Sequence, residues 1–310
     1  MLNLTLRQLR AIGAIYRTGK IVTAAKELGL TQPAVSLQLR DAEAAAGVSL
    51  FDRTSEGMRP TAAGLAVVEA ANAIEERLRV LADEVGAITG GRRGTLRIGV
   101  ISTAKYFAPA MMAAFMREHP QIEMSLLVGN REETINNLRD HKIDVALMGR
   151  PPREIAVQSA LFGQHPLVMI APPDHPLAGQ RQISKERIAQ ESFLLREPGS
   201  GTRTSLDMFL SDLPGRAENL GVEMGSNETI KQAVMAGLGI ALISAHTIAQ
   251  EVQAGRLAVL DVEGLPIRRQ WFSVTRADRS LTPVMTAFEE FLTLQGSRFL
   301  PDVVRAAEAI

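Results

Sequence analysis

Three hydrogen-bonding side chains, Gln32, Ser36 and Arg40, fall on one face of a helix that is expected to begin at Thr31. Thr31 is a good N-cap residue, and Pro33 falls in the first turn, where a missing N–H costs little. Amide, hydroxyl and guanidinium groups reach base edges and phosphates when the N-terminal end of such a helix enters the major groove of DNA. The chemistry predicted for these five residues is therefore DNA recognition.

The helix that carries these side chains, Thr31–Ala46, follows two shorter helical patterns, Leu6–Thr18 and Val22–Leu28, with Gly29 as the turn. Small side chains of the second pattern face the apolar side of the third helix. Two helices cross closely in this way in a helix-turn-helix.

The segment 50–61 has the features of a β-hairpin wing. It has an apolar anchor at Leu50 and Phe51, a turn glycine at Gly57, and two arginines, Arg53 and Arg59. We expect Arg53 to contact the DNA backbone or the minor groove. Residues 1–60 hold eight basic and five acidic side chains, a local net charge of +3, whereas the whole chain has a net charge of zero.

One long helical pattern spans Thr61–Thr89. Its apolar residues recur at alternating steps of four and three, the spacing of a coiled-coil seam. They are Val67, Ala71, Ile74, Leu78, Leu81, Val85 and Ile88. Such a stripe needs a partner helix, so we expect a homodimer joined through this linker; the alternative is a helix that packs on its own core. The run Gly90–Gly94 then predicts a flexible joint.

After Gly94, short β-type runs alternate with helical stretches, which predicts open parallel α/β sheets. The expected strands are Thr95–Val100, Met124–Val128, Val145–Met148, Leu167–Ile170, Phe193–Leu195, Gly239–Ile243, Leu257–Leu260 and Trp271–Thr275. A chain of 310 residues has room for about two domains. We expect an all-α winged helix-turn-helix over 1–60, a linker helix over 61–90 and an α/β domain over 91–310.

Ligands of open α/β sheets lie outside the carboxyl ends of the strands, where loops and helix N-termini present free N–H groups. That rule selects side chains that are mostly hydroxyls, amides and cations. They are Ser102, Thr103, Lys105, Asn130, Arg131, Gly149, Arg150, Arg196, Thr202, Arg203, Ser226 and Asn227. With Glu197 as its one acidic neighbour, the set suits an anion. For Lys105 and Arg131 a solvated surface charge is an equally good interpretation.

Composition argues against several classes of site. The chain has no cysteine, which excludes disulfides and thiolate chemistry, and its five histidines show no metal-ligand spacing, so no metal or cofactor is expected. No export signal or run of about 20 apolar residues is apparent, which favours the cytoplasm. An enzyme is disfavoured because Gly199–Thr202 lacks P-loop spacing and the histidines lie beside no nucleophile pair. His165 and His175 are interpreted as loop residues beside prolines.

Four short runs carry a family resemblance: 24–28 (AAKEL), 31–36 (TQPAVS), 47–53 (GVSLFDR) and 60–64 (PTAAG). They resemble the signature of LysR-type transcriptional regulators. The sequence departs from that pattern at Ala42-Glu43, where the family usually has Leu-Glu.

The resemblance implies a bilobal C-terminal domain like a periplasmic binding protein, with a small molecule held between the lobes. By that resemblance lobe one is 94–161 plus 269–294 and lobe two is 162–268. It also implies double-stranded operator DNA and RNA polymerase as partners, and homodimers that pair into tetramers. A plain solute-binding protein, the second rival class, is disfavoured by the DNA-binding head.

A narrower resemblance lies in 102–109 (STAKYFAP), 128–132 (VGNRE), 148–152 (MGRPP), 196–203 (REPGSGTR) and 226–232 (SNETIKQ). These runs resemble the CbbR branch of the family, activators of carbon-fixation (RuBisCO, Calvin cycle) operons. That branch implies an effector such as a phosphorylated sugar, phosphoenolpyruvate or a nucleotide. The alternative is a LysR-type regulator of another pathway with a different effector.

Overall fold

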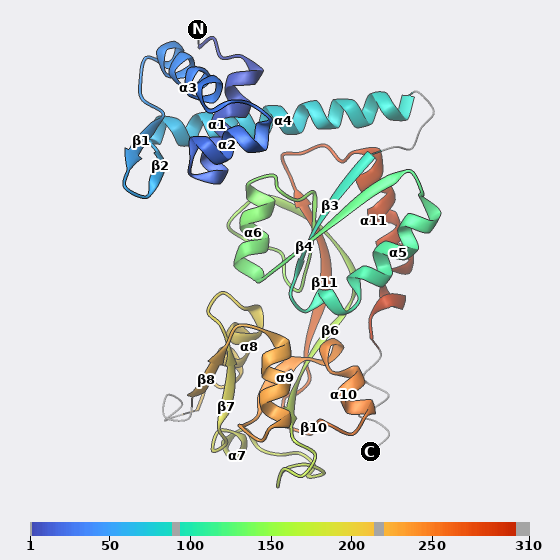
Figure 1. Ribbon diagram of the computed structural model, residues 1–310. Helices are drawn as coiled ribbons and strands as arrows, with labels where there is room; N and C mark the ends of the chain where they lie inside the picture. Colours follow the sequence, from blue (N-terminus) through green and yellow to red (C-terminus); the bar gives the residue numbers. More distant parts are fainter. Residues whose placement is uncertain (1, 89–93, 214–219, 302–310) are drawn as a thin grey trace. The chain divides into compact units, whose positions relative to one another are not determined.

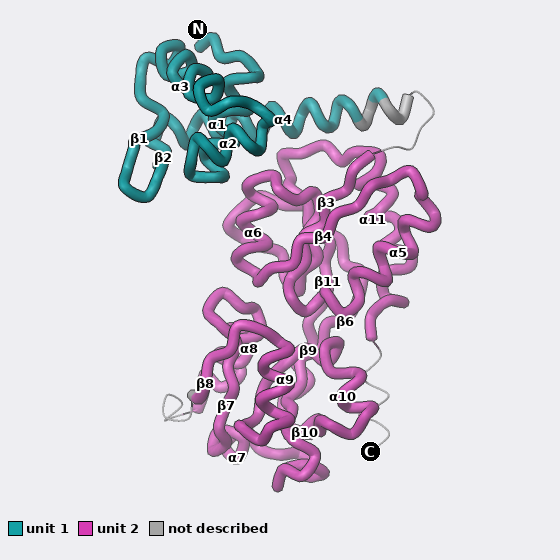
Figure 2. Tube along the Cα trace, viewed as in Figure 1, with its two compact units in different colours: residues 1–85 teal, residues 86–310 magenta. Residues whose placement is uncertain are grey.

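The computed structural model describes residues 2–88, 94–213 and 220–301. The chain divides into two compact units, residues 1–85 and 86–310 (Figure 2). The Gly90–Gly94 joint expected from the sequence lies outside the described residues, except for Gly94 itself.

Unit 1 is a helical domain with a two-stranded hairpin (Figure 1). Its elements are α1 Leu6–Thr18, α2 Ile21–Leu28, α3 Gln32–Ala46, β1 Phe51–Thr54, β2 Gly57–Pro60 and α4 Ala62–Ile88. Helix α3 starts where its cap predicts, because the Thr31 side chain accepts a hydrogen bond from the Ala34 N–H. Ile12, Ile15 and Val35 are fully buried where the first three helices meet.

The hairpin is fixed against the helices at two close approaches of the backbone. A Cβ on Gly57, which has a φ of +138°, would lie 2.4 Å from the Gly19 carbonyl oxygen, and the Met58 N–H donates to that same oxygen. A Cβ on Gly64, at the start of α4, would lie 1.9 Å from the Leu50 carbonyl oxygen. Glycine is therefore required at both positions, and the two contacts set where the hairpin projects.

Unit 2 contains two parallel βα arrangements linked by two antiparallel strands. Its strands are β3 Gly94–Ile101, β4 Ile122–Gly129, β5 Val145–Met148, β6 Val157–Ala171, β7 Phe193–Arg196, β8 Leu220–Met224, β9 Ala241–Ser244, β10 Ala258–Leu260 and β11 Ile267–Arg276. Its α-helices are α5 Ala108–Glu118, α6 Arg131–Arg139, α7 Lys185–Ile188, α8 Gly201–Phe209, α9 Asn227–Met235, α10 Ala249–Gln253 and α11 Pro283–Gln295.

The strand order β10-β6-β11-β5-β3-β4, with β9 also paired to β6, makes a seven-stranded sheet. Strand β3 pairs in parallel with β4 and β5, and β7 pairs in parallel with β8. The long strands β6 and β11 pair antiparallel with each other and run between the lobe that holds α5, α6 and α11 and the lobe that holds α8 and α9 (Figure 1). The predicted parallel pairing is thus found within each lobe, whereas the two strands that connect the lobes pair antiparallel.

Two expectations about the strands need correction. Strand β8 was not predicted, because the run Leu220–Met224 is only five residues long and has a glycine at its second position, although its apolar residues do alternate. Strand β6 begins ten residues before the predicted run Leu167–Ile170. The earlier residues were not predicted as strand because they mix polar and apolar side chains without regular alternation.

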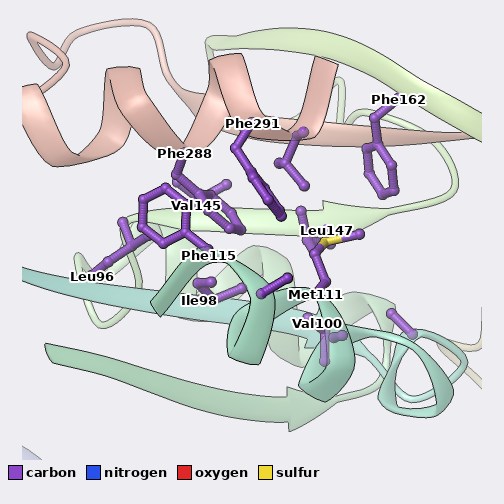
Figure 3. Packing of buried hydrophobic residues seen from close by; sticks show 14 of the residues in the cluster. Leu96, Ile98, Val100, Met111, Phe115, Val145, Leu147, Phe162, Phe288 and Phe291 are labelled. Carbon is purple, nitrogen blue, oxygen red and sulfur yellow. The ribbon is translucent and has the colours of Figure 1, made fainter. Parts of the chain in front are cut away.

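Each lobe has its own apolar core. In the first lobe, Phe115 of α5 meets Phe288 and Phe291 of α11 edge to face, with ring centroids 5.1 and 5.4 Å apart (Figure 3). These rings cover β3 and β5, whose Ile98 and Leu147 belong to the same cluster. Buried aromatic pairs of this kind hold the sheet rigid, so the loops at its strand ends keep fixed positions.

Candidate DNA-reading and effector sites

Helix α3 presents its polar face to solvent. Gln32 and Arg40 are exposed and Ser36 is partly exposed, whereas Val35 and Leu39 are buried against α1 and α2. Thr31 and Pro33, at the N-terminal end of the helix, are also exposed. The hydrogen-bonding groups selected from the sequence are therefore free to meet a ligand at the end of the helix that enters a groove in helix-turn-helix proteins.

Arg53 lies on β1, opposite Met58 of β2, and is exposed. The wing that carries Arg53 is held by the Glu43 side chain of α3. The Leu50 N–H donates to Glu43 Oε1 at 2.8 Å, and the Phe51 N–H donates to the same oxygen at 3.4 Å. Ala42 is fully buried in the helical core. Glu43 thus ties α3 to the first strand of the wing.

A small cavity of about 30 Å³, partly open to solvent, lies where the loops of the two lobes of unit 2 face each other. It is lined by residues of both lobes: Ile101, Ser102, Thr103, Asn130, Arg131, Gly149, Arg150, His165, Arg196, Ser200, Gly201, Thr202 and Arg269. No carboxylate side chain is present among these lining residues.

The N-terminus of α8 forms one wall of this cavity. Ser200 is the N-cap residue, but its side chain makes no capping bond, and Ser200 and Thr202 are both buried. The N–H groups of a helix's first turn have no partner within the helix, so they bind anions readily. By contrast, the N-terminus of α6 is capped by Asn130, which accepts from the Glu133 N–H at 2.9 Å.

The four cavity arginines are not equivalent. Arg196 is already neutralised, because its Nε and Nη2 atoms each lie 2.7 Å from a carboxylate oxygen of Glu197. Arg131 donates to the carbonyl oxygens of Arg150 and Pro151, and Arg269 donates to that of Gly201 at 3.1 Å. Burial lowers the pKa of both Arg131 and Arg269, and the positive charge of Arg150 lowers both pKa values further. Three guanidinium groups therefore repel one another around the cavity, and an anion would relieve that repulsion.

Eight of the twelve residues selected from strand ends line the cavity, namely Ser102, Thr103, Asn130, Arg131, Gly149, Arg150, Arg196 and Thr202. The structure places the other four, Lys105, Arg203, Ser226 and Asn227, outside the lining.

Those four residues have structural partners. The Lys105 ammonium lies 5.2 Å from the centre of the Tyr106 ring. Arg203 donates to the Arg196 carbonyl oxygen at 3.2 Å. Ser226 caps α9, and the buried Asn227 accepts a hydrogen bond from Arg196 Nη1. Asn227 thus acts behind the cavity wall, by orienting Arg196.

Two lining residues, His165 and Arg269, were not predicted from the sequence as part of the site. Both lie inside the connecting strands, where they are direct cross-strand partners of each other. The interpretation of His165 as a loop residue was wrong: the side chain is in β6, 3% exposed, and it lines the cavity. Residues in the middle of a strand cannot be found by a rule that looks only at strand ends.

Both units match family models. Residues 6–65 match the bacterial regulatory helix-turn-helix protein of the lysR family, and residues 89–296 match the LysR substrate binding domain. The chain belongs to the LysR family, and it is a DNA-binding transcriptional regulator with an effector-binding domain like a periplasmic binding protein. None of the described helices is long and apolar enough to cross a membrane.

Individual relatives narrow the class. The chain is 60% identical over 303 residues to the HTH-type transcriptional regulator CbbR of Sinorhizobium medicae, covering 98% of this chain and 97% of the relative. It is 45% identical to the RuBisCO operon transcriptional regulator of Allochromatium vinosum, covering 96% and 98%. Among solved structures, the Synechocystis CcmR regulatory domain in complex with 2-PG superposes with a TM-score of 0.61 at 36% identity, covering 65% of this chain and 97% of that one.

Proposed function

We propose that this regulator controls carbon-fixation genes, the RuBisCO operon among them, in response to an anionic phosphorylated metabolite bound between the two lobes of unit 2. The high identity to CbbR proteins and to a RuBisCO operon regulator supports the target genes. The CcmR domain bound to 2-PG, which is 2-phosphoglycolate, supports the effector class.

The observation that carries the effector class is the charge of the cavity. Arg131, Arg150 and Arg269 surround it without a lining carboxylate, and the uncapped N-terminus of α8 adds N–H donors. A phosphoryl dianion can accept from several of these donors at once, whereas an amino acid or an aromatic acid brings less charge. In this proposal Ser102, Thr103, Asn130, Gly149, Arg196 and Thr202 complete the contact, and Arg203, Ser226 and Asn227 support it from behind.

Operator recognition in this proposal rests on Thr31, Gln32, Pro33, Ser36, Arg40 and Arg53. The protein acts as a homodimer joined through α4, with pairing of dimers into tetramers and contact with RNA polymerase at the promoter. Because its operators are bacterial chromosomal DNA, it works in the cytoplasm.

A ligand titration tests the effector. Thermal unfolding of the full chain is followed with 2-phosphoglycolate, phosphoenolpyruvate, ribulose bisphosphate and ATP, and with glycolate as the matched compound that lacks the phosphate. A ligand at a hundred times its Kd stabilises the folded state by about 2.7 kcal/mol. A phosphorylated effector would be ruled out if glycolate stabilised the protein as much as 2-phosphoglycolate does. It would also be ruled out if none of these compounds stabilised the protein.

A matched pair of variants on α8 tests the location. Thr202→Ala alters a residue of the cavity wall, whereas Thr204→Ala alters an exposed residue two positions on. On DNA from a RuBisCO operon promoter, we expect Thr202→Ala to bind normally without effector but to lose most of the effector-dependent change in footprint. Thr204→Ala should respond like the wild type. Identical effector midpoints and amplitudes for all three proteins would remove Thr202 from the site.

A further inference from the structure

His165 is a buried imidazole with no hydrogen-bond partner. Its side chain is 3% exposed, and neither Nδ1 nor Nε2 has a partner among the described residues. A neutral imidazole has one donor and one acceptor nitrogen, and leaving a buried polar group unpaired is expensive enough that native proteins rarely do so without a role for it.

The ring is held in place by packing. It stacks on Trp271 with the ring centroids 4.0 Å apart and the planes 16° from parallel. A Cβ on Gly149 would lie 2.7 Å from His165 Nδ1, so the backbone at the end of β5 passes directly against the ring edge. This packing holds the ring in one orientation. In that orientation neither ring nitrogen reaches a hydrogen-bonding group of the described residues.

His246, a second histidine in the same stack, has a hydrogen-bond partner. The ring centroids of His246 and His165 are 6.1 Å apart, and the two rings are nearly parallel. The Nδ1 atom of His246 accepts a hydrogen bond from Trp271 Nε1 at 3.1 Å. His246 does not line the cavity, whereas His165 does. The unpaired histidine is thus the one beside the space where an effector would sit.

The charged side chains that line the cavity with His165 are positive, and one of them, Arg196, is paired with the Glu197 carboxylate. Arg269 is the cross-strand partner of His165, and Arg131, Arg150 and Arg196 also line the cavity, while the titratable group behind it is His246. Burial lowers the pKa of His165 well below its ordinary value, and His246 and Arg269 lower that pKa further. The imidazole is therefore neutral in the empty protein.

We propose that His165 is a contact of the anionic effector and takes up a proton when the anion binds. The inference rests on the proposed phosphorylated effector and adds a residue and a regulation to that site. A dianion next to His165 stabilises the imidazolium, which then donates a hydrogen bond to an anion oxygen. By linkage, the effector binds more tightly as the pH falls, up to about tenfold per pH unit between the His165 pKa values of the bound and empty protein.

Proton counting tests this directly. Titration calorimetry of the full chain with 2-phosphoglycolate at pH 6.5, in buffers of different ionisation enthalpy, gives the number of protons taken up per effector. Three variants are compared with the wild type. His165→Phe keeps the stacking and removes both nitrogens, His165→Gln keeps a donor that does not titrate, and His246→Gln changes the other imidazole of the stack. Inorganic sulfate is titrated as a second probe. Its charge is constant from pH 5 to 8, so protons bound by the ligand do not contribute to the measured proton uptake.

The expected result is that the wild type and His246→Gln take up about half a proton or more beyond either His165 variant. His165→Gln should still bind, with a Kd that no longer depends on pH for sulfate. If 2-phosphoglycolate binds but all four proteins take up the same number of protons, the role of His165 is wrong and the proposed function stands. If neither phosphate nor sulfate compounds bind the wild type, both proposals are overturned.

Discussion

The Tyr106 hydroxyl donates a hydrogen bond to the Glu228 carboxylate, and this contact joins the two lobes of unit 2. Burial and the Glu228 carboxylate raise the pKa of Tyr106, so the phenol stays protonated. Two neighbouring bonds span the lobes at the same place. Ser102 accepts from Arg196 at 3.2 Å, and Thr103 accepts from Asn227 at 3.4 Å. The residues after β3 thus contact the second lobe beside the cavity as well as lining it.

Removing the tyrosine hydroxyl should weaken this junction. We expect Tyr106→Phe to lower the free energy of unfolding by about 1–2 kcal/mol, because a hydrogen bond to a charged group is lost in a partly buried site. Tyr16→Phe, on the exposed surface of α1, should stay within about 0.5 kcal/mol of the wild type. Urea unfolding of the full chain measures both. Equal losses for the two variants would mean that the Tyr106 bond does not stabilise the junction.

The buried histidines should make the protein sensitive to acid. Burial lowers the pKa of His246 from 6.5 to about 4. The unfolded chain therefore takes up a proton near pH 6.5 that the folded state refuses, so stability is full above pH 6.5 and falls as the pH drops toward 4. Between pH 7.5 and 5 this amounts to about 2 kcal/mol for His246.

The matching variant is His246→Gln, which retains an acceptor for the Trp271 N–H. Its unfolding free energy should fall by about 2 kcal/mol less than that of the wild type over the same pH range. Denaturant titrations at pH 7.5 and 5 give the comparison. Parallel losses in the two proteins would show that His246 is accessible to protons in the folded state.

Base and phosphate contacts should differ in their effect on DNA binding. We expect Gln32→Ala to weaken binding to the operator by about 1–3 kcal/mol and binding to random DNA very little. Arg53→Ala, on the wing, should weaken binding to both DNAs and flatten the salt dependence. Mobility shifts at several salt concentrations check both expectations. A Gln32→Ala protein with equal losses on operator and random DNA would contradict base contact.

Helix α4 should be the dimer contact. Ile74, Leu78, Leu81 and Val85 of its apolar stripe are 39–50% exposed in the single chain. Since a row of exposed apolar residues is unfavourable in water, a second copy of the helix is the natural cover. The double variant Leu78→Glu, Leu81→Glu should be monomeric by sedimentation velocity and bind the operator at least tenfold more weakly. A stable dimer with unchanged affinity would exclude the seam.

Local rules predict local features of this chain well. The start of α3 follows from Thr31 and Pro33, and the residues after parallel strands, such as Ser102 and Asn130, do lie at one cavity. Such features depend on a few neighbouring residues and on a general property of parallel sheets.

Long-range pairing could not be predicted in the same way. His165 reaches the cavity because β6 pairs with β11 a hundred residues later, and the sequence around His165-Pro166 has no strand pattern of its own. Whether the Arg196 charge is paired depends on side-chain geometry. Glu197 is its neighbour in the sequence, but only the structure shows that the two form an ion pair. Counting arginines therefore overestimates the charge offered to an effector.

The paired strands β6 and β11 also decide how the lobes can move. Ten residue pairs, from Ile267 with Leu167 to Arg276 with Val157, form one ribbon through both lobes, interrupted by a register shift between Trp271 and Phe272. Sliding one lobe past the other would break ladder bonds, whereas a two-stranded ribbon twists easily, most of all at a bulge. We therefore expect the two lobes to rotate about the ribbon axis more easily than they slide past each other.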